Sequence, residues 1–184
     1  FIAAPYAAKL LADMGADGVK VEPPLLGDGA RRYGPFPKDE PHPEKSGLFL
    51  FLNTSKRGIT LDATVPTGRE VLRRLLRDAD ILIEGLPQAA VEECSLDYPS
   101  LARDNERLIV VSVTPFGRTG LWSRYKGHAV NVAASSGRSL QIGNPDRPPL
   151  TLPLSLADFE GGVSGAIGAQ LALFARRKTG RGQH

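Results

Sequence analysis

Two short apolar stretches, each preceded by a helix-forming segment, constrain the fold more than any other feature of this sequence. Residues 81–84 (ILIE) and 107–113 (RLIVVSV) have the apolar runs that are typical of buried strands. The segments before them, residues 64–80 and 98–105, have helical patterns. Strands that alternate with helices pair in parallel through right-handed crossovers. The sequence therefore predicts an α/β fold with a parallel sheet flanked by helices.

The helix expected over residues 64–80 has the clearest amphipathic pattern. Thr67 and Glu70 have the spacing of a capping box at its start. Arg69, Arg73 and Arg77 are expected to face water, so the opposite side is predicted to pack on the sheet. The side chains expected on that inner side are Val71, Leu72, Leu75, Leu76 and Ala79.

Further elements are expected before this unit. Residues 5–15 predict a helix, and residues 18–22 and 59–62 predict short strands. The apolar run at residues 48–53 fits either a buried strand or a short helix. Residues 25–47 show no periodicity and predict a long loop, which at this length is usually functional or mobile.

The chain is expected to finish with a second group of elements. Residues 127–137 predict a helix that ends at Gly137, and residues 150–156 predict an extended segment. The last helix is predicted from about Asp158 to Lys178. Its expected apolar stripe consists of Phe159, Val163, Ile167, Leu171 and Phe174.

Asp158, at the start of that last helix, is the first candidate for chemistry. Aspartate is a good N-cap residue, so one interpretation gives it only a structural role. The second interpretation is functional, because the helix start favours an ionised carboxylate, which can attack an activated acyl group. Gly161, Gly162 and Gly165 each cost the helix about 1 kcal/mol relative to alanine. A neighbouring helix or a ligand is therefore expected close to this backbone.

Composition narrows the other possibilities. With 184 residues, of which 41% are hydrophobic and 23% charged, the chain suits one domain with a hydrophobic core. The net charge of +3 is spread over short basic pairs without interleaved aromatic residues, which favours a small phosphate-bearing ligand over nucleic acid. No apolar run has the length of a membrane span.

The cysteine, the histidines and the missing sequence motifs exclude further classes of site. A single cysteine, Cys94, allows no internal disulfide and favours a cytoplasmic setting. No metal site is expected, because His42, His128 and His184 lack ligand spacing. Glycine-rich phosphate loops and the nucleophile elbow of hydrolases are missing from the sequence. His128 is more often a structural residue, but with Asp158 it could form a proton-transfer pair.

Several stretches taken together resemble family III CoA-transferases, the group that also includes the α-methylacyl-CoA racemases. They follow one another in family order along nearly the whole chain. The matching stretches are APYAAKLLADMGADGVKVEPP, NTSKRGITLD with PTGREVL, ADILIE, LDYPSLARDNERLIVVSVTPFGRTG and ADFEGGVSGAIGAQLALFARRKTGRGQ. The resemblance implies a Rossmann-like large domain that is incomplete in this chain. Residues 1–184 would be the N-terminal part of that CoA-binding domain, without the small domain and the C-terminal return.

The resemblance implies an acyl-CoA:carboxylate CoA-transferase in which Asp158 forms a covalent aspartyl intermediate. Acyl-CoA and a carboxylic acid would be its substrates, with no permanently bound cofactor, and the full-length protein would be an interlocked homodimer. A basic residue that is common in the family after the third strand is replaced here by Glu92-Glu93. The residues that would contact CoA are Ala3, Leu61, Asp62, Ala63, Thr64, Gly85, Leu86, Pro87, Gly127 and His128.

Two alternatives stay open at this point. A racemase-type isomerase would use His128 and Asp158 as an acid/base pair on opposite faces of the α-carbon of an acyl-CoA. The racemases carry an Asp directly after that His, where this chain has Ala129. The other alternative is a homologue that binds CoA without catalysis.

Overall fold

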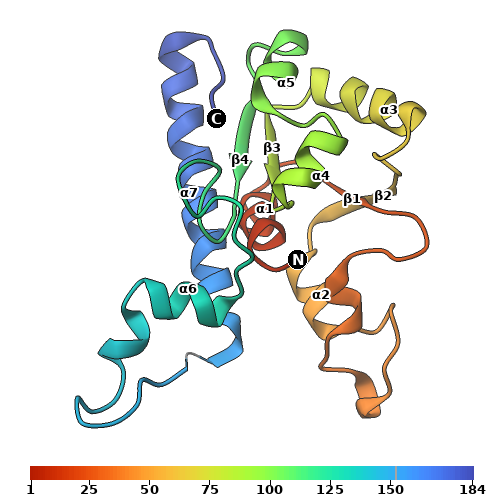
Figure 1. Cartoon of the computed structure of the whole chain (residues 1–184). Helices are drawn as coiled ribbons and strands as arrows, with labels where there is room; N and C mark the ends of the chain where they lie inside the picture. The colour runs from red at the N-terminus through yellow and green to blue at the C-terminus, as the bar shows by residue number, and fades with distance from the viewer. Residues whose placement is uncertain (152) are drawn as a thin grey trace.

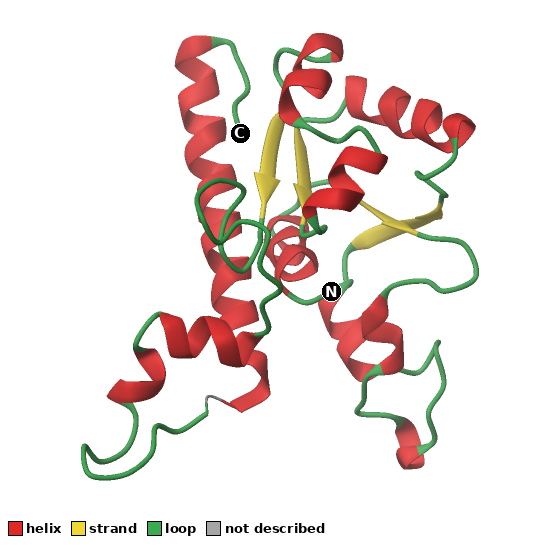
Figure 2. Cartoon of the chain, in the orientation of Figure 1, coloured by secondary structure: helices red, strands yellow, loops and turns green. Residues whose placement is uncertain are grey.

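A computed structural model describes residues 1–151 and 153–184 of the chain. Two strands lie at the centre of the molecule, with helices on both of their faces (Figures 1 and 2). The α-helices are α1 (Ala3–Asp13), α2 (Gly47–Leu52), α3 (Pro66–Arg77), α4 (Gln88–Glu93), α5 (Tyr98–Asp104), α6 (Ala129–Ser135) and α7 (Leu156–Thr179). The strands are β1 (Gly18–Glu22), β2 (Lys56–Thr60), β3 (Ile81–Glu84) and β4 (Ile109–Ser112). Short 3-10 turns are η1 (Gly29–Arg32), η2 (Pro37–Asp39), η3 (Arg138–Gln141) and η4 (Pro153–Ser155).

The predicted α/β fold with parallel strands is confirmed. β1 pairs with β2 and β3 pairs with β4, and both pairs are parallel. Within the described residues, however, these are two separate two-stranded sheets. The second strand also begins earlier than expected, at Lys56, and the apolar run before it forms the helix α2.

The β3–β4 pair is buried on both faces, which explains its continuous apolar sequence. On one face, Leu82 and Val110 pack against side chains of α3, α4 and α5. On the other face, Ile81, Ile83 and Val111 pack against α1 and α7. The sheet therefore separates the layer of α3, α4 and α5 from a layer made by the first and last helices.

The helix α3 agrees only in part with its predicted pattern. Leu72 and Leu76 are buried as expected, whereas Val71 and Leu75 are exposed. The predicted capping box at Thr67 is wrong, because the helix begins at Pro66 and no side chain caps it. Proline is favoured in the first turn since it has no N–H group to satisfy there.

Of the apolar stripe expected on α7, Phe159 packs in the core near Ile2 and Leu52, but the other four residues lie on the exposed face. Val163, Ile167, Leu171 and Phe174 are exposed, whereas the buried residues are Gly162, Ala166, Ala169, Ala172 and Arg176. Small side chains let the backbones of α1 and α7 approach closely, so the buried side of α7 is its small-residue side. α7 contacts α1 along this side (Figure 1).

The segments before and after α7 complete this part of the chain. The extended segment predicted over residues 150–156 includes Leu152, which lies outside the described residues. The last residues run beside β4, where the Val110 amide donates to the Gln183 carbonyl at 3.0 Å and the Gly182 amide donates to Glu106 at 2.8 Å. Across the described residues, no helix combines the length and the apolar character needed to cross a membrane.

Candidate functional site

Asp158 is the third residue of α7 and does not cap it. The helix begins at Leu156, and the N-cap position is taken by Ser155, whose side chain makes no capping bond. No hydrogen bond joins the Asp158 carboxylate to any other residue that the structure describes. The structural interpretation of this aspartate as an N-cap is therefore wrong.

The surroundings of Asp158 oppose ionisation rather than favour it. Its side chain is half-buried, and this burial raises the pKa of the carboxyl group above its usual value. The positive charge of the N-terminal amino group, and to a smaller extent that of His128, lowers the pKa in part. The expectation that the helix start would favour the ionised form is corrected here, because loss of solvent outweighs the positive charges near the carboxylate.

The glycines after Asp158 fit against α1 and the end of β4. A β-carbon on Gly162 would lie 2.8 Å from the Ala3 carbonyl oxygen, and one on Gly165 would lie 2.8 Å from a methyl group of Val113. Both distances are too short for ordinary packing. A β-carbon on Gly161 would meet only normal contacts, 3.5 Å from Val113. The small residues therefore serve the packing of α7 against its neighbours, which was one of the two predicted reasons for them.

The predicted contact residues Ala3 and Gly85 lie beside this part of α7. Gly85 follows β3, and its β-carbon position is 3.4 Å from Ala4 and 3.1 Å from the Val113 carbonyl oxygen. Ala3 begins α1 and faces Gly161 and Gly162. The start of α1 and the carboxyl ends of β3 and β4 thus meet near the first turns of α7. Ligands of open parallel sheets bind at this end of the strands.

A buried ion pair fixes the loop with Leu86 and Pro87. Glu84 ends β3, and its carboxylate accepts two hydrogen bonds from Arg118, each at 2.5 Å. It also accepts the Leu86 amide at 2.7 Å. Sequence reasoning missed this pair because Arg118 is 34 residues away from Glu84 and no local spacing links the two. The pair ties the loop after β3 to the loop after β4.

Gly127 and His128 form the start of α6. A β-carbon on Gly127 would lie 2.6 Å from Pro115 and would overlap that residue, so only glycine fits here. His128 is exposed, and its amide donates to the Asn131 side chain at 3.1 Å. His128 directly precedes α6, which contacts α7, the helix that carries Asp158.

The predicted segment Leu61–Thr64 lies apart from Asp158, at the start of α3. The Asp62 carboxylate accepts hydrogen bonds from the Thr64 amide at 2.9 Å and from its hydroxyl at 2.5 Å. A β-carbon on Gly68 would lie 1.7 Å from the Asp62 carbonyl oxygen, so the turn rests directly on α3. Leu61 and Ala63 pack into the core below it. Among the described residues, no hydrogen bond or ion pair joins this turn to Asp158.

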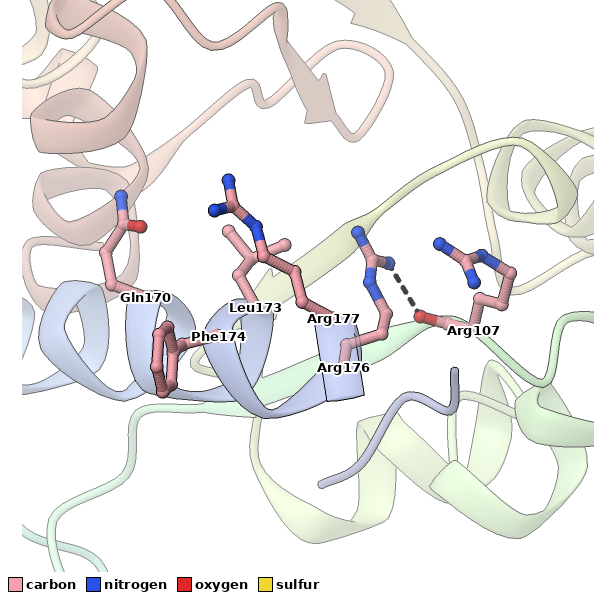
Figure 3. A pocket seen from close by; sticks show the side chains of 6 residues that line it. All are labelled: Arg107, Gln170, Leu173, Phe174, Arg176 and Arg177. Atoms are coloured by element: carbon pink, nitrogen blue, oxygen red, sulfur yellow. Dashed lines mark hydrogen bonds between the residues drawn. The ribbon is translucent and has the colours of Figure 1, made fainter. Parts of the chain in front are cut away.

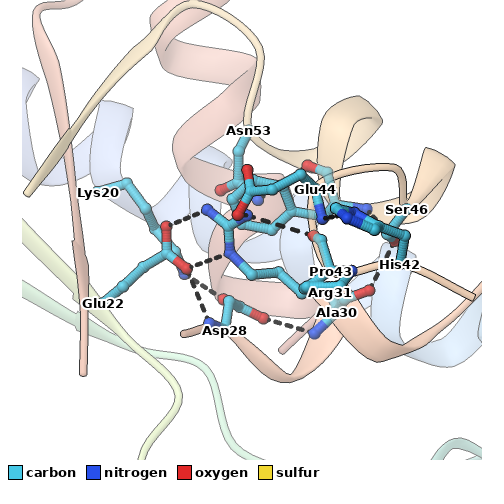
Figure 4. A network of polar contacts seen from close by, with 11 residues as sticks. Lys20, Glu22, Asp28, Ala30, Arg31, His42, Pro43, Glu44, Ser46 and Asn53 are labelled. Carbon is cyan, nitrogen blue, oxygen red and sulfur yellow. Dashed lines mark hydrogen bonds and ion pairs between the residues drawn. The ribbon is translucent and has the colours of Figure 1, made fainter. Parts of the chain in front are cut away.

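The long loop over residues 25–47 is held by a polar network that the sequence did not predict (Figure 4). The Arg31 guanidinium donates to Glu22 at 2.7 and 2.9 Å and lies 3.7 Å from the centre of the Phe49 ring. Asp28 pairs with Lys20, and its amide donates to Glu22 at 2.8 Å. The hydrogen-bonded ion pair with Arg31 lowers the pKa of the Glu22 carboxyl group. The loop is thereby attached to the carboxyl end of β1.

Lys56 links α1 to α2. Its ammonium donates to the carbonyl oxygens of Pro5 and Leu52, both at 2.7 Å, and to Asn53 at 3.1 Å. Burial lowers the pKa of Lys56 to about 8. Three acceptors without charge hold this cation, so its role is to satisfy backbone carbonyls at the end of α2 and the start of α1.

Two surface hollows lie away from Asp158. One, of about 480 Å³, is between the start of β4 and the second half of α7, and Arg107, Phe174 and Arg176 are among the residues that line it (Figure 3). The other, of about 460 Å³, runs along α3. Neither includes Asp158 or any residue predicted to contact CoA.

The family model and the similar proteins agree on one family, the CoA-transferases of family III. The family described as CoA-transferase family III matches residues 1–184. A subunit of succinyl-CoA:(R)-benzylsuccinate CoA-transferase from Thauera aromatica is 39% identical over 97% of this chain and 43% of its own length. Succinate–glutarate CoA-transferase from Agrobacterium fabrum is 37% identical over 100% of this chain and 46% of its own length.

A racemase and a solved structure match at similar levels. Human α-methylacyl-CoA racemase is 35% identical over 97% of this chain and 42% of its own length. The crystal structure of a CaiB/BaiF family protein from Brucella suis superposes with a TM-score of 0.89 and 36% identity, over 100% of this chain and 48% of that one. This chain thus spans less than half the length of the relatives it matches, and identity alone does not separate the two reaction classes.

Proposed function

Because this chain belongs to CoA-transferase family III, we propose that Asp158 is the nucleophile of an acyl-CoA:carboxylate CoA-transferase. The observation that supports this role is the environment of its carboxylate. The group is half-buried at the carboxyl end of the sheet, and no hydrogen bond from a described residue engages its oxygens. Such a carboxylate keeps its lone pairs free for attack on an acyl carbon.

The proposed reaction converts the Asp158 carboxylate into two covalent intermediates and regenerates it at the end. An Asp158 oxygen attacks the thioester carbon of acyl-CoA, and the carbon–sulfur bond breaks. CoA departs as the thiolate, and a mixed anhydride of Asp158 and the acyl group is formed. The thiolate then attacks the Asp158 carbonyl and releases the donor acid, which gives an aspartyl-CoA thioester. The acceptor carboxylate attacks that thioester, and the thiolate returns to the acceptor acyl carbon, which regenerates Asp158.

Trapping of the intermediate tests this proposal. The protein is incubated with succinyl-CoA and then with hydroxylamine, and peptide mass spectrometry should find a hydroxamate at Asp158. Asp158→Asn should lose at least about a thousandfold in turnover. Glu160→Gln is the matched control, because Glu160 lies two residues away and pairs with Arg138 at 2.9 Å. An unmodified Asp158, or full activity in the Asn variant, contradicts the proposal.

One observation favours a second candidate, a racemase-type isomerase. His128 directly precedes α6, which packs against α7 with Asp158 in its first turn, and an acid/base pair on one substrate needs two such neighbouring elements. The diagnostic result is deuterium incorporation at the α-carbon of a 2-methylacyl-CoA without an acceptor acid, which His128→Ala should abolish. CoA-dependent thermal protection with neither exchange nor transfer would instead indicate a binding-only homologue.

The exposed row Val163, Ile167, Leu171 and Phe174 on α7 supports the proposed homodimer of the full-length protein. An apolar row of this kind is typical of a surface that another protein element covers. Ile167→Lys in the full-length protein should shift the mass measured by light scattering toward the monomer. An unchanged dimer would show that this row is covered by something other than the partner.

A further inference from the structure

The start of α7 is not fixed by the usual local devices. Leu154 and Ser155, the two residues before it, have left-handed backbone conformations with φ of 52° and 54°, which residues other than glycine rarely adopt. The Ser155 side chain makes no capping bond to a described residue. A first turn without a capping side chain is less stable. The position of Asp158 in this turn therefore has to be set by tertiary contacts.

Phe159, the residue directly after Asp158, makes such a contact. Its ring meets the Tyr6 ring of α1 in a T-shaped arrangement, with the ring centroids 5.0 Å apart and the planes at 83°. Phe51 of α2 lies 6.1 Å from the Tyr6 ring and 6.4 Å from the Phe159 ring. Aromatic pairs at such distances are favourable beyond the apolar area that they bury. These three rings form an aromatic anchor that joins α1, α2 and α7.

Tyr6 is the central member of the aromatic anchor. One of its ring carbons is 2.9 Å from the β-carbon position of Gly162, so the ring also lies against the second turn of α7. Tyr6 and Phe159 pack in the core cluster that contains the buried residues Ile2 and Leu52. Positions 159 and 162 are three residues apart and so lie on one side of the helix. Contacts at both positions fix the rotation of α7 about its own axis.

An ion pair at the same turn is a weaker contact. Glu160 pairs with Arg138 at 2.9 Å, but the two side chains are 39% and 49% exposed, and exposed ion pairs contribute little to stability. The two helices under the aromatic anchor are themselves joined, because the Lys56 ammonium donates to the carbonyl oxygens of Pro5 in α1 and Leu52 in α2, both at 2.7 Å. The aromatic anchor therefore rests on a firm base.

We propose that Tyr6 and Phe159 are positioning residues, which set the direction in which the Asp158 carboxylate projects. Neighbouring residues of an α-helix are about 100° apart around its axis, so a Phe159 ring held in the aromatic anchor also fixes the direction of Asp158. A misplacement of about 1 Å in a reacting group can cost about a hundredfold in rate. This inference rests on the proposed role of Asp158 as the nucleophile.

Hydrogen exchange tests the positioning without any substrate. In the full-length protein, Phe159→Leu and Tyr6→Leu remove the aromatic contact but keep an apolar side chain. The amides of residues 160–162 are the first that can donate to carbonyl oxygens inside α7, and their exchange should become about tenfold faster in both variants. Tyr6→Phe keeps the ring and should stay within about twofold of the original protein.

Tyr98→Leu is the matched control. Tyr98 is a partly buried tyrosine in the first turn of α5, and it packs against the core on the other face of β3 and β4. Its replacement should lower the overall stability. Exchange at residues 160–162 and turnover per folded molecule should nevertheless stay within about twofold of the original protein, because the site is distant.

Steady-state kinetics separate positioning from substrate binding. Phe159→Leu and Tyr6→Leu should lower kcat by about ten- to a hundredfold, with the KM for succinyl-CoA within about threefold of the original value. Tyr6→Phe should restore kcat to within about threefold. A merely structural role would reduce the amount of folded enzyme but would leave kcat per folded molecule unchanged.

Unchanged exchange at residues 160–162 in both leucine variants would overturn this inference, and so would an equal change in the Tyr98 control. Faster exchange with unchanged kcat would overturn the positioning role and leave the aromatic anchor as a structural contact. A failure to trap Asp158 in the original protein would remove the transferase proposal. Hydrogen exchange would then still decide whether the aromatic anchor fixes the first turn of α7.

Discussion

Asp158 and Arg176 lie near opposite ends of α7, and the surroundings of these two charged side chains differ. Arg176, near the end of the helix, is only 8% exposed, and it donates to the carbonyl oxygens of Asp80 and Arg107 and pairs with the Asp80 carboxylate at 2.5 Å. Asp158, in the first turn, is half-buried without a hydrogen bond to a described residue. The difference indicates that Arg176 is built into the structure, whereas Asp158 costs stability and so needs another reason to be there.

Removal of the buried cation should give the largest effect on stability. Arg176→Met leaves the carbonyl oxygens of Asp80 and Arg107 without their donor. We expect the free energy of unfolding to fall by about 3 kcal/mol, measured by urea denaturation. Arg177→Met, one residue further along at an exposed position, should change it by less than about 0.5 kcal/mol. Equal effects of the two substitutions would contradict a structural role for Arg176.

A methyl group on the packed side of α7 should have the next largest effect. Gly165→Ala places a β-carbon 2.8 Å from Val113, and we expect a loss of about 2 kcal/mol in thermal or urea unfolding. Gly168→Ala has open space around it and should instead stabilise the helix by up to about 1 kcal/mol. Opposite signs at two positions on one helix would separate packing from helix propensity, and equal signs would refute the close approach of β4.

Neutralising Asp158 should have the smallest effect on stability. Asp158→Asn removes a half-buried charge without breaking a hydrogen bond, so we expect a gain below about 1 kcal/mol at pH 7. The pH dependence has a defined sign. Because burial raises the pKa of Asp158, the folded state holds its proton at a pH where the unfolded state has lost it.

The stability that this proton contributes is complete below the ordinary pKa near 3.8 and is lost as the pH rises through the folded-state pKa. The advantage of the Asn variant over the original protein should therefore grow as the pH rises from about 4 and then level off. Unfolding curves of both proteins over this range measure it. A gain that is largest at the lowest pH would show that the carboxylate is stabilised rather than desolvated.

The sequence predicted those parts of the fold in which apolar residues follow a regular spacing. The strands β3 and β4 and the helices α3 and α5 were located because each has a clear local pattern. α7 was located as well, but its buried side was not. Apolar periodicity selects Val163 and Ile167, whereas the close contact with α1 depends on residues with almost no side chain.

The site roles of the residues taken from the resemblance stay predictions. The structure does place Ala3 and Gly85 beside the first turns of α7, where Asp158 lies. It does not bring Leu61–Thr64 to Asp158. The ion pairs Glu84–Arg118 and Glu22–Arg31 escaped prediction because their partners are separated in sequence and no local spacing marks them.

The contact between Gly162 and the Ala3 carbonyl has a consequence for how substrate preference can change among related proteins. The Tyr6 side chain also reaches this point, 2.9 Å from the β-carbon position of Gly162, so the α1 backbone and one aromatic ring together support the first turns of α7. If Asp158 is the proposed nucleophile, a change of acid preference would have to arise mainly in the surrounding loops, which tolerate substitution more readily than packed helices do.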